Sequence, residues 1–496
     1  MSKKTVQRET PDVSPLPDLP HGWTWSSIKA LASPEPFSIT DGPFGSNLKS
    51  EHYTESGPRV VRLQNIGDGT FIDAKAHISE GHFEKLKKHQ IFSGDIVIAA
   101  LGETLPRACL IPPSLGPAIV KADCIRFRPR QDIVGPYLNY ALNSHPVRTR
   151  TKRIVHGVGR PRLNLSEIKS ISLPIAPITL QVGIVSEIEK HFSRLDSALA
   201  SLKRVQVELK RYRASVLAAA CSGRLVPTEA ELARKKKRDY EPALELLKRI
   251  LHERRSRWEA DYLAKQKTLP KDDAWKKKYK EPFAPDTSEL PELPEGWCWA
   301  TVAQLGDIQL GRQRSPKNRS KHHPTKYVRA ANITVQGLAL DDVLDMEFTP
   351  AELERYRLGN GDIILSEASG SASQVGKPAI WRDEIPDCCF QNTVIRFRPF
   401  RLKSGYPFLL FLHFYVNGIF SKVAGGVGIN HLGADKFSAI PFPLPPMSEQ
   451  VRIVPEVERL LSIQVEVQDV INKKIVHSAA LRQSILRHAF TGRLVQ

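Results

Sequence analysis

The segment at residues 369–378 has the residue types of a phosphate-binding loop, with glycines, short hydroxyls and a lysine close together. Its spacing does not fit that chemistry. Gly370 lies one residue too far from Gly376 and Lys377, and Pro378 stands where a metal-binding Ser or Thr is needed. We interpret the segment as a surface loop between strands, where hydroxyls and a lysine face phosphates or base edges.

Other catalytic signatures fail as well. The acids and lysine of 270–276 resemble those of metal-dependent nucleases, but they stand in a lysine-rich linker with no flanking strand to hold the carboxylates together. Residues 111–114 lack the leading Asn or Asp and the aromatic with which amino-methyltransferases hold a flipped base. No glycine-rich cofactor loop follows a strand, and neither the histidines at 322–323 nor the six cysteines have metal-ligand spacing. The sequence predicts no catalytic, cofactor or metal site.

Composition points to a polyanionic partner. The 496 residues suffice for at least two domains, and 41% hydrophobic with 25% charged residues is ordinary for a globular protein. The net charge of +19 and the pI of about 9.6 are not ordinary, and they favour a phosphate-rich partner. The start lacks the apolar core of a signal peptide, and the longest apolar run, 407–416, is too short to cross a bilayer. We therefore expect a cytoplasmic protein with reduced cysteines.

The elements that would position any site are present twice. Residues 19–25 (LPHGWTW) return as 293–299 (LPEGWCW), and the repetition continues in order along the chain. The further matched segments are 94–98 with 361–365, 125–129 with 395–399, 157–159 with 426–428, and 222–226 with 491–495. Two similar but unequal halves in a basic protein indicate two similar but unequal binding events on one polyanion.

Each repeat divides into a strand-rich part and a long helix. Short β-branched runs such as 59–63 and 95–99, broken by Gly, Pro and Asn, predict an α+β domain with a mixed or antiparallel sheet. The predicted divisions are an N-terminal extension (1–19), a first strand-rich domain (20–175), a first helical region (176–226), a charged linker with a short helix (227–288), a second strand-rich domain (289–446) and a second helical region (447–496). In the linker, Leu244, Leu247, Leu251 and Trp258 fall on one helical face.

The two helical regions carry matching heptad seams, which are typical of a coiled coil; a helix lying on a globular core would show a wider stripe at period 3.6. In the first region the seam is Ile188, Leu195, Leu202, Leu209 and Val216, interleaved with Ile184, His191, Ala198, Val205, Tyr212 and Ala219. In the second it is Val457, Leu460, Val467, Ile471, Leu481 and Ile485, while Gln464, Lys474 and Ser478 depart from it. Two such helices predict an antiparallel pair, on the order of 65 Å long for about 45 residues each.

In this order the motifs resemble the specificity subunit of type I restriction-modification systems, over essentially the whole chain. The segments that carry the resemblance are 41–49, 62–66 and 157–165 in the first repeat and 311–316, 328–333 and 425–432 in the second. One departure is Thr179–Gln181, where the second repeat has an acid, Glu449; we expect this to affect only the capping of the first helix.

The resemblance implies two target-recognition domains separated by the two long helices. It implies a non-catalytic subunit that binds double-stranded DNA at an asymmetric, two-part target. It also implies recruitment of two modification subunits and, for cleavage, of ATP-dependent restriction subunits. S-adenosylmethionine, ATP and magnesium would belong to those partners.

Within this interpretation, polar residues in or near the matched segments, and in the loop at 369–378, are candidate DNA contacts. In the first repeat we predict Ser46, Arg62, Gln64 and Asn65 on bases, with Lys49, Arg160 and Arg162 on phosphates. In the second we predict Arg312, Arg314, Arg329, Asn332 and Ser371 on bases, with Lys317, Lys377 and Lys422 on phosphates. Since Gln64 corresponds to Ala331, the two half-sites should differ. For each of these residues the alternative is a surface or strand-end hydrogen bond with no role in reading bases. The adjoining Phe44 either contacts a thymine methyl group or packs in the core.

Two other functions stay open from the sequence. A methyltransferase or nuclease with a divergent active site would act as the purified chain alone. A coiled-coil scaffold would associate with proteins but show no salt-dependent affinity for DNA.

Overall fold

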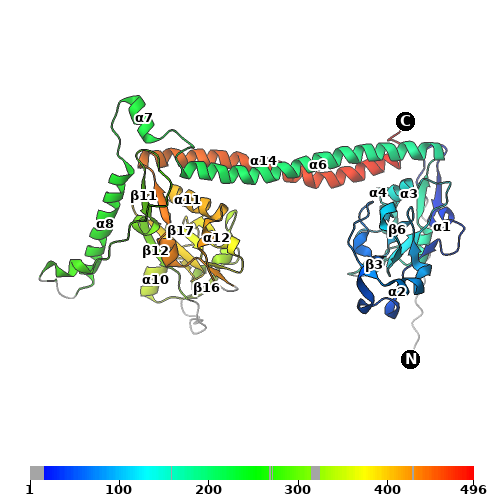
Figure 1. Cartoon of the computed structure of the whole chain (residues 1–496), viewed down its shortest axis with the longest axis horizontal. Coiled ribbons are helices and arrows are strands. Elements are labelled where there is room, and N and C mark those ends of the chain that lie inside the picture. Colours follow the sequence, from blue (N-terminus) through cyan, green and yellow to red (C-terminus); the bar gives the residue numbers. More distant parts are fainter. Residues whose placement is uncertain are drawn as a thin grey trace. The chain divides into compact units, whose positions relative to one another are not determined.

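The computed structural model describes residues 16–157, 159–266, 270, 272–313, 324–426 and 429–495. The chain forms two compact units (Figure 1): the first comprises 1–204 with 471–496, and the second comprises 205–470. Each unit therefore contains one strand-rich domain and part of each long helix. No helix in the described part of the chain is both long and apolar enough to cross a membrane.

The first unit contains two four-stranded sheets. One is antiparallel throughout, in the order β2 (Ile39–Thr40), β9 (Cys124–Phe127), β6 (Ile96–Ala99), β7 (Arg107–Leu110). The other has the order β4 (His77–Ile78), β3 (Tyr53–Val61), β8 (Ala118–Val120), β5 (Gln90–Ile91), and in it β3 runs parallel to β8. The strand pair β1 (Thr24–Ser27) and β10 (Ser172–Ile175) and the helices α1 (Ile28–Leu31), α2 (Glu80–Lys85), α3 (Gly135–Leu142), α4 (His145–Thr151) and α5 (Leu165–Ser170) complete the domain.

The second unit repeats this plan. Its antiparallel sheet is β12 (Gly306–Leu310), β21 (Val394–Pro399), β17 (Ile363–Ser366), β19 (Pro378–Ile380), and its mixed sheet is β16 (Leu344–Glu347), β13 (Pro324–Val328), β20 (Cys389–Phe390), with β13 parallel to β20. Three strand pairs accompany them: β11 (Cys298–Thr301) with β23 (Pro441–Leu444), β14 (Ile333–Thr334) with β15 (Gly337–Leu338), and β18 (Ala368–Ser369) with β22 (Asn430–His431). The helices are α9 (Val302–Leu305), α10 (Pro350–Tyr356), α11 (Gly405–Val416), α12 (Ile419–Val423) and α13 (Ala434–Ser438). The predicted α+β class with mixed and antiparallel sheets is confirmed.

The repeated Gly-Asp and Phe-Arg motifs form one ion pair in each unit, in which the aspartate is buried. Asp95 is buried and accepts two hydrogen bonds from Arg128, at 2.8 and 3.1 Å, while Asp362 accepts two from Arg398, both at 2.7 Å. A bidentate pair of this kind fixes the approach of two strands, because the guanidinium and the carboxylate match in only one orientation. These repeated residues therefore stabilise the sheet and are not part of a site.

The long helices are α6 (Ile178–Cys221) and α14 (Met447–Ala489), and they pair antiparallel within each unit. In the first unit, Ile188 shares a core with Leu486, and further along α6 the ring of Phe192 lies 4.7 Å from the Arg482 guanidinium. In the second unit, Ala220 shares a core with Ile453, and Arg213 lines a cavity together with Leu461. In both, the residue number rises along one helix as it falls along the other.

The inward face of each helix differs from the predicted seam at every second position. The residues one heptad apart lie inside: Ile188, Val216, Val457 and Ile471 are buried, and Leu195, Leu202, Leu209 and Ile485 are partly buried. The interleaved series is wrong along most of each helix, since Val205, Tyr212, Val467 and Leu481 are exposed, by 43%, 43%, 39% and 42%. It is correct at Ile184, which is buried, and Leu460 of the same row is partly buried. The inward positions are one residue later, at Phe192, Leu199, Gln206, Arg213 and Ala220 on α6 and at Gln468, Ile475 and Arg482 on α14.

The physical reason is the choice between two seams. A heptad places its second inward residue either three or four positions after the first, and one position rotates a residue by about 100° around the helix. The apolar Val205, Val467 and Leu481 favoured a spacing of three. The structure has a spacing of four, which turns polar Gln206, Arg213, Gln468 and Arg482 toward the partner helix.

Each long helix ends against the entry segment of a strand-rich domain. Gly223, after α6, has φ +69°, and a Cβ there would lie 2.5 Å from Cγ of Pro294. Gly492, after α14, has φ +70°, and its Cβ would lie 2.4 Å from Cγ of Pro20. Glycine is required at both places by the backbone angle and by the close approach of the proline.

The linker is more ordered than predicted. It contains α7 (Glu229–Lys236) and α8 (Ala243–Ala264), and α8, with 22 residues, exceeds the short helix expected there. Leu247 packs inward as predicted, but Leu244 is 50% exposed; the inward face is Ala243, Leu246, Leu247 and Ile250, in the core of the second unit.

The acid Glu449 of the second repeat does more than cap a helix. It is buried, and its carboxylate accepts hydrogen bonds from Nε1 of Trp297 (3.0 Å) and from the backbone N–H of Glu229 (2.9 Å). It thus ties α7 and the entry segment of the second domain to α14. The first repeat has Leu180 at this position, 41% exposed, so the expectation that only capping differs between the repeats is corrected.

Candidate nucleic-acid interface

In the first unit, several strands end at one edge, which we call the first strand-end edge. Because β3 and β8 are parallel, they finish together: the N–H of Lys121 donates to the carbonyl of Val61 at 2.8 Å. The N–H of Ala100, directly after β6, donates to the carbonyl of Asp123 at 2.8 Å. Arg62 follows β3 directly and so lies at this edge.

The turn at 156–162 joins the same edge from a distant part of the sequence. The N–H of Gly102 donates to the carbonyl of Pro161 (3.1 Å), and Arg162 forms an ion pair with Asp123. Gly157 has φ +97°, and a Cβ there would lie 2.6 Å from the carbonyl oxygen of Arg160. The glycine is needed for the turn that carries Arg160 and Arg162 to the edge.

The second unit has an equivalent second strand-end edge. The N–H of Gln391 donates to the carbonyl of Val328 (2.9 Å) where the parallel strands β13 and β20 end. The N–H of Ala330 donates to Oγ1 of Thr393 (3.1 Å). The chain around 425–432 is attached to this edge through Leu432, whose N–H donates to the carbonyl of Glu367 (2.9 Å). The structure thus brings Leu432, at the end of the second glycine-containing segment, to the same edge as Arg329.

The predicted readers Arg62 and Arg329 occupy the same position in both units, just before a single 3-10 turn, η3 (Leu63–Asn65) and η8 (Ala330–Asn332). Arg62 donates from Nη2 to the carbonyl of Lys75 (3.2 Å), and Arg329 pairs with the exposed Asp342. Both side chains are partly exposed. Between each arginine and asparagine, Gln64 and Ala331 are exposed, so the turns differ at the position that faces solvent.

Asn65 and Asn332 are not readers, which corrects the prediction. They are 1% and 3% exposed. Asn65 accepts the N–H of Arg62 (2.8 Å) and donates to the carbonyls of Ile72 (2.8 Å) and Ala74 (2.9 Å). Asn332 accepts the N–H of Arg329 and donates to the carbonyls of Ala339 and Asp342, each at 3.0 Å. With both ends of the amide used, neither side chain has a group left for a base edge.

Arg312 is also committed inside the protein, contrary to its predicted reading role. Its side chain is 12% exposed, Nε pairs with Glu352 at 2.7 Å, and Nη1 bonds the carbonyl of Glu347. The guanidinium lies 4.9 Å from the centre of the Phe348 ring. These contacts leave Arg312 as a brace between β12 and α10.

The remaining predicted residues lie on separate segments of the chain, among them the 3-10 turn η1 (Gly45–Asn47) and α12. Ser46 and Lys49 are exposed in and beside η1, with Lys49 3.6 Å from Glu51, and Phe44 is 49% exposed and therefore outside the core. Arg160 and Lys422 are exposed, and the Ser371 hydroxyl is exposed 2.9 Å from that of Ser373. Lys377 donates from Nζ to the carbonyl of Ile333 at 3.3 Å. Arg314 and Lys317 lie outside the described residues.

Sequence reasoning missed Arg107, which lies beside Gln64; the neighbouring Arg148 is buried and bonded inside the protein, as Arg312 is. Arg107 and Arg148 line a cavity of about 640 Å³ together with Gln64 and Asp68. Arg107 donates to the carbonyl of Leu63 (3.2 Å), and Arg148 donates to that of Pro106 (3.0 Å) and pairs with Asp68. Arg107 is the counterpart of Lys377. In the first unit Ile96 of β6 pairs with Leu110, and in the second unit the matched Ile363 of β17 pairs with Ile380; Arg107 and Lys377 each lie three residues before that partner. Aligning the repeats would have found it.

The described residues contain no group of three or more His, Cys, Asp or Glu side chains placed to hold a metal ion. The candidate interface consists of the two strand-end edges, with Arg62, Arg160 and Arg162 at the first and Arg329 at the second, and of exposed lysines and hydroxyls on other segments of the same domains. Such groups contact phosphates and the edges of bases.

Known proteins share this architecture and order of motifs. A family model described as the type I restriction modification DNA specificity domain matches residues 294–476. The EcoKI specificity subunit of Escherichia coli strain K12 is 20% identical over 488 residues, covering 96% of this chain and 90% of that protein. The StySPI specificity subunit of Salmonella potsdam is 23% identical over 491 residues, with coverage of 96% and 90%.

Solved structures show the same fold. The HsdS subunit from Thermoanaerobacter tengcongensis matches with a TM-score of 0.54 and 16% identity, covering 96% of this chain and 98% of that one. A chain from a structure of the assembly and conformational transition of the type I R-M system matches with a TM-score of 0.63 and 17% identity, with coverage of 96% and 99%. Residues 294–476 thus match the type I restriction modification DNA specificity domain, and nearly the whole chain is similar to type I restriction enzyme specificity subunits.

Proposed function

We propose that this chain binds DNA as the specificity subunit of a type I restriction-modification complex and reads an asymmetric target in two half-sites. The family is that of the DNA-recognition subunit and not of a catalytic one. The observation that carries the proposal is the repetition, at the same edge of two sheets, of one exposed turn preceded by an arginine. The turns differ in their exposed residue, Gln64 against Ala331.

The chemistry of reading follows from these side chains. An arginine that meets guanine O6 and N7 in the major groove and a glutamine that meets adenine N6 and N7 form the bidentate pairs that separate base pairs. Arg62 and Gln64 supply both types in the first unit, whereas the second unit supplies Arg329 with no amide beside it. Lys49, Arg160 and Lys422, being exposed, serve as phosphate contacts that set position and not sequence.

Two variants distinguish a residue that reads bases from a residue that only contacts phosphates. We expect Arg62→Ala to weaken binding to the target by about 1 to 3 kcal/mol and to relax one position of the first half-site. We expect Lys49→Ala to weaken binding to all sequences and to lower the slope of log affinity against log salt by about 0.9, one phosphate contact. Competition titrations with target and scrambled duplexes at several salt concentrations measure both. Equal effects of Arg62→Ala on the two duplexes would remove Arg62 from the readers.

Specificity subunits are part of type I restriction-modification complexes with DNA. We propose two modification subunits and ATP-dependent restriction subunits as the partners of this chain. In the second unit, Val207, Tyr212, Ile463, Val467 and Val470 are exposed on the long helices, and such apolar residues suit docking of partner helices. S-adenosylmethionine, ATP and magnesium then belong to the partners, and the complex acts on cytoplasmic DNA.

The proposal is tested by activity with and without a partner. We expect the pure chain to bind DNA in a salt-dependent way but to show no nuclease or methyl transfer, and to direct methylation at one asymmetric sequence when a modification subunit is added. Sequencing of methylated positions in DNA exposed to the two proteins identifies the site. Methyl transfer or metal-dependent cutting by the chain alone would favour an enzyme, and absence of DNA binding would favour a scaffold.

A further inference from the structure

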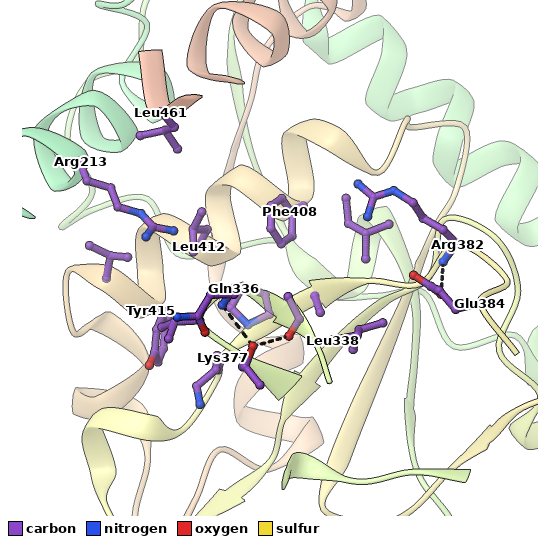
Figure 2. Close-up of a pocket in the computed structure, with 17 residues that line it drawn as sticks. Arg213, Gln336, Leu338, Lys377, Arg382, Glu384, Phe408, Leu412, Tyr415 and Leu461 are labelled. Carbon is purple, nitrogen blue, oxygen red and sulfur yellow. Dashed lines mark hydrogen bonds between the residues drawn. The ribbon is translucent and has the colours of Figure 1, made fainter. Parts of the chain in front are cut away.

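A cavity of about 360 Å³ lies in the second unit between the strand-rich domain and the helical pair (Figure 2). Its floor is the hairpin β14–β15 with β19, and one wall is α11, through Phe408, Leu412 and Tyr415. Arg213 of α6 and Leu461 of α14 close the side formed by the long helices. The hairpin follows directly after η8, the turn that Arg329 precedes, so the cavity adjoins the proposed reader.

The Arg213 guanidinium enters this cavity without a neutralising partner. Its Nε is buried without a hydrogen-bond partner, and no described carboxylate pairs with the side chain. Burial lowers the pKa of Arg213, because removing the guanidinium from water disfavours its charged form. The other charged lining residues are Lys377, Arg382 and Glu384, and Glu384 already accepts the N–H of Arg382 at 2.8 Å. The cavity therefore carries an excess of positive charge.

The first unit provides an internal comparison. Arg482 occupies on α14 the position that Arg213 occupies on α6, since 222–226 matches 491–495. Arg482 stacks on Phe192 and pairs with Asp196 of the facing helix. The counterparts of these two residues in the second unit are Leu461 and Val465. Where the first unit has a carboxylate, the second unit has a valine, and the same arginine is left uncompensated.

We propose that Arg213 binds a phosphate of the DNA backbone at the mouth of this cavity, so that the helical pair itself contacts DNA beside the second reader. A phosphate supplies the missing charge, and a guanidinium offers it two N–H groups in a bidentate arrangement. DNA is favoured over an acidic side chain of a partner subunit because the cavity adjoins the reader turn: Lys377, which lines the cavity, donates to the carbonyl of Ile333, the residue directly after that turn. The inference rests on the proposed function and adds a contact outside the target-recognition domains.

The test uses the full chain and target and scrambled duplexes over a range of salt concentrations. We expect Arg213→Met to weaken binding to both duplexes equally, by about fivefold at low salt, and to lower the salt slope by about 0.9. Val465→Asp, which restores the acid of the first unit, should lower the slope in the same way while keeping the arginine. Arg482→Met is the matched control and should leave the slope unchanged, because Asp196 already neutralises that arginine.

Circular dichroism and thermal melts establish that each variant is folded, and Val465→Asp, at an exposed position, covers the case in which Arg213→Met does not fold. Unchanged slopes for both second-unit variants overturn the inference while leaving the proposed function in place. Loss of association with a modification subunit at unchanged DNA slope assigns the cavity to a partner carboxylate and also overturns it. A wild-type chain without salt-dependent DNA binding overturns the proposed function itself.

Discussion

Asn65→Ala is expected to destabilise the first unit by about 3 kcal/mol, and Asn332→Ala the second unit by a similar amount. Each substitution removes the three hydrogen bonds that a buried amide makes, which in the first unit are those with the N–H of Arg62 and with the carbonyls of Ile72 and Ala74. Urea unfolding measures the loss of stability. Hydrogen exchange of peptides from each unit shows which unit has lost it.

The matched control is the adjacent residue. Gln64 is exposed, and we expect Gln64→Ala to change stability by less than about 0.5 kcal/mol while changing which bases the first half-site accepts. The neighbouring positions thus separate folding from reading. If Asn65→Ala instead leaves the first unit stable and relaxes a base position, then the buried amide is a reader and our correction is mistaken.

The same pair of residues shows what sequence could and could not predict. The duplicated motifs identified both turns and both strand-rich domains, because repetition is visible without coordinates. They did not distinguish Gln64 from Asn65, since polarity does not reveal burial. Only the path of the following chain, which brings the carbonyls of residues 72 and 74 within 2.9 Å of the Asn65 amide, assigns that residue to the fold.

The long helices show a second limit of the same kind. The period of seven was visible and gave one correct row on each helix. The sequence did not show which of two adjacent positions belongs to the second row, because an exposed leucine followed by an inward arginine, as at 481 and 482, reverses the usual hydrophobic pattern. The prediction chose the row that contains Val467 and Leu481 because these residues are apolar. The row that faces the partner helix contains Arg213 and Arg482 instead. The inference about DNA phosphate depends on that row and was therefore out of reach of the sequence.

A chain cut after Val226 is expected to dimerise and to direct methylation at a palindrome made of the first half-site and its inverted copy. The core of the first unit is completed by Leu486, Ala489 and Phe490, at the end of α14, which this truncated chain lacks. Their counterparts on α6 are Leu217, Ala220 and Cys221. A second copy can insert these residues in place of the missing ones, and two copies that do so to each other are related by a twofold axis. Sedimentation measures the dimer, and methylation mapping with the modification partner identifies the target.

One residue decides how tightly that dimer holds. Phe490 is buried and makes an edge-to-face contact with Tyr137, with the ring centres 5.2 Å apart, whereas the incoming residue is the much smaller Cys221. Cys221→Phe in the truncated chain should fill the space and contribute about 2 kcal/mol at each of two sites, which tightens the dimer at least about a hundredfold. Cys221→Ala is the control and should not tighten it. A monomeric truncated chain, or a dimer that the phenylalanine does not stabilise, would mean that the end of α6 cannot take the place of α14 and that the helices do not set the arrangement of the readers.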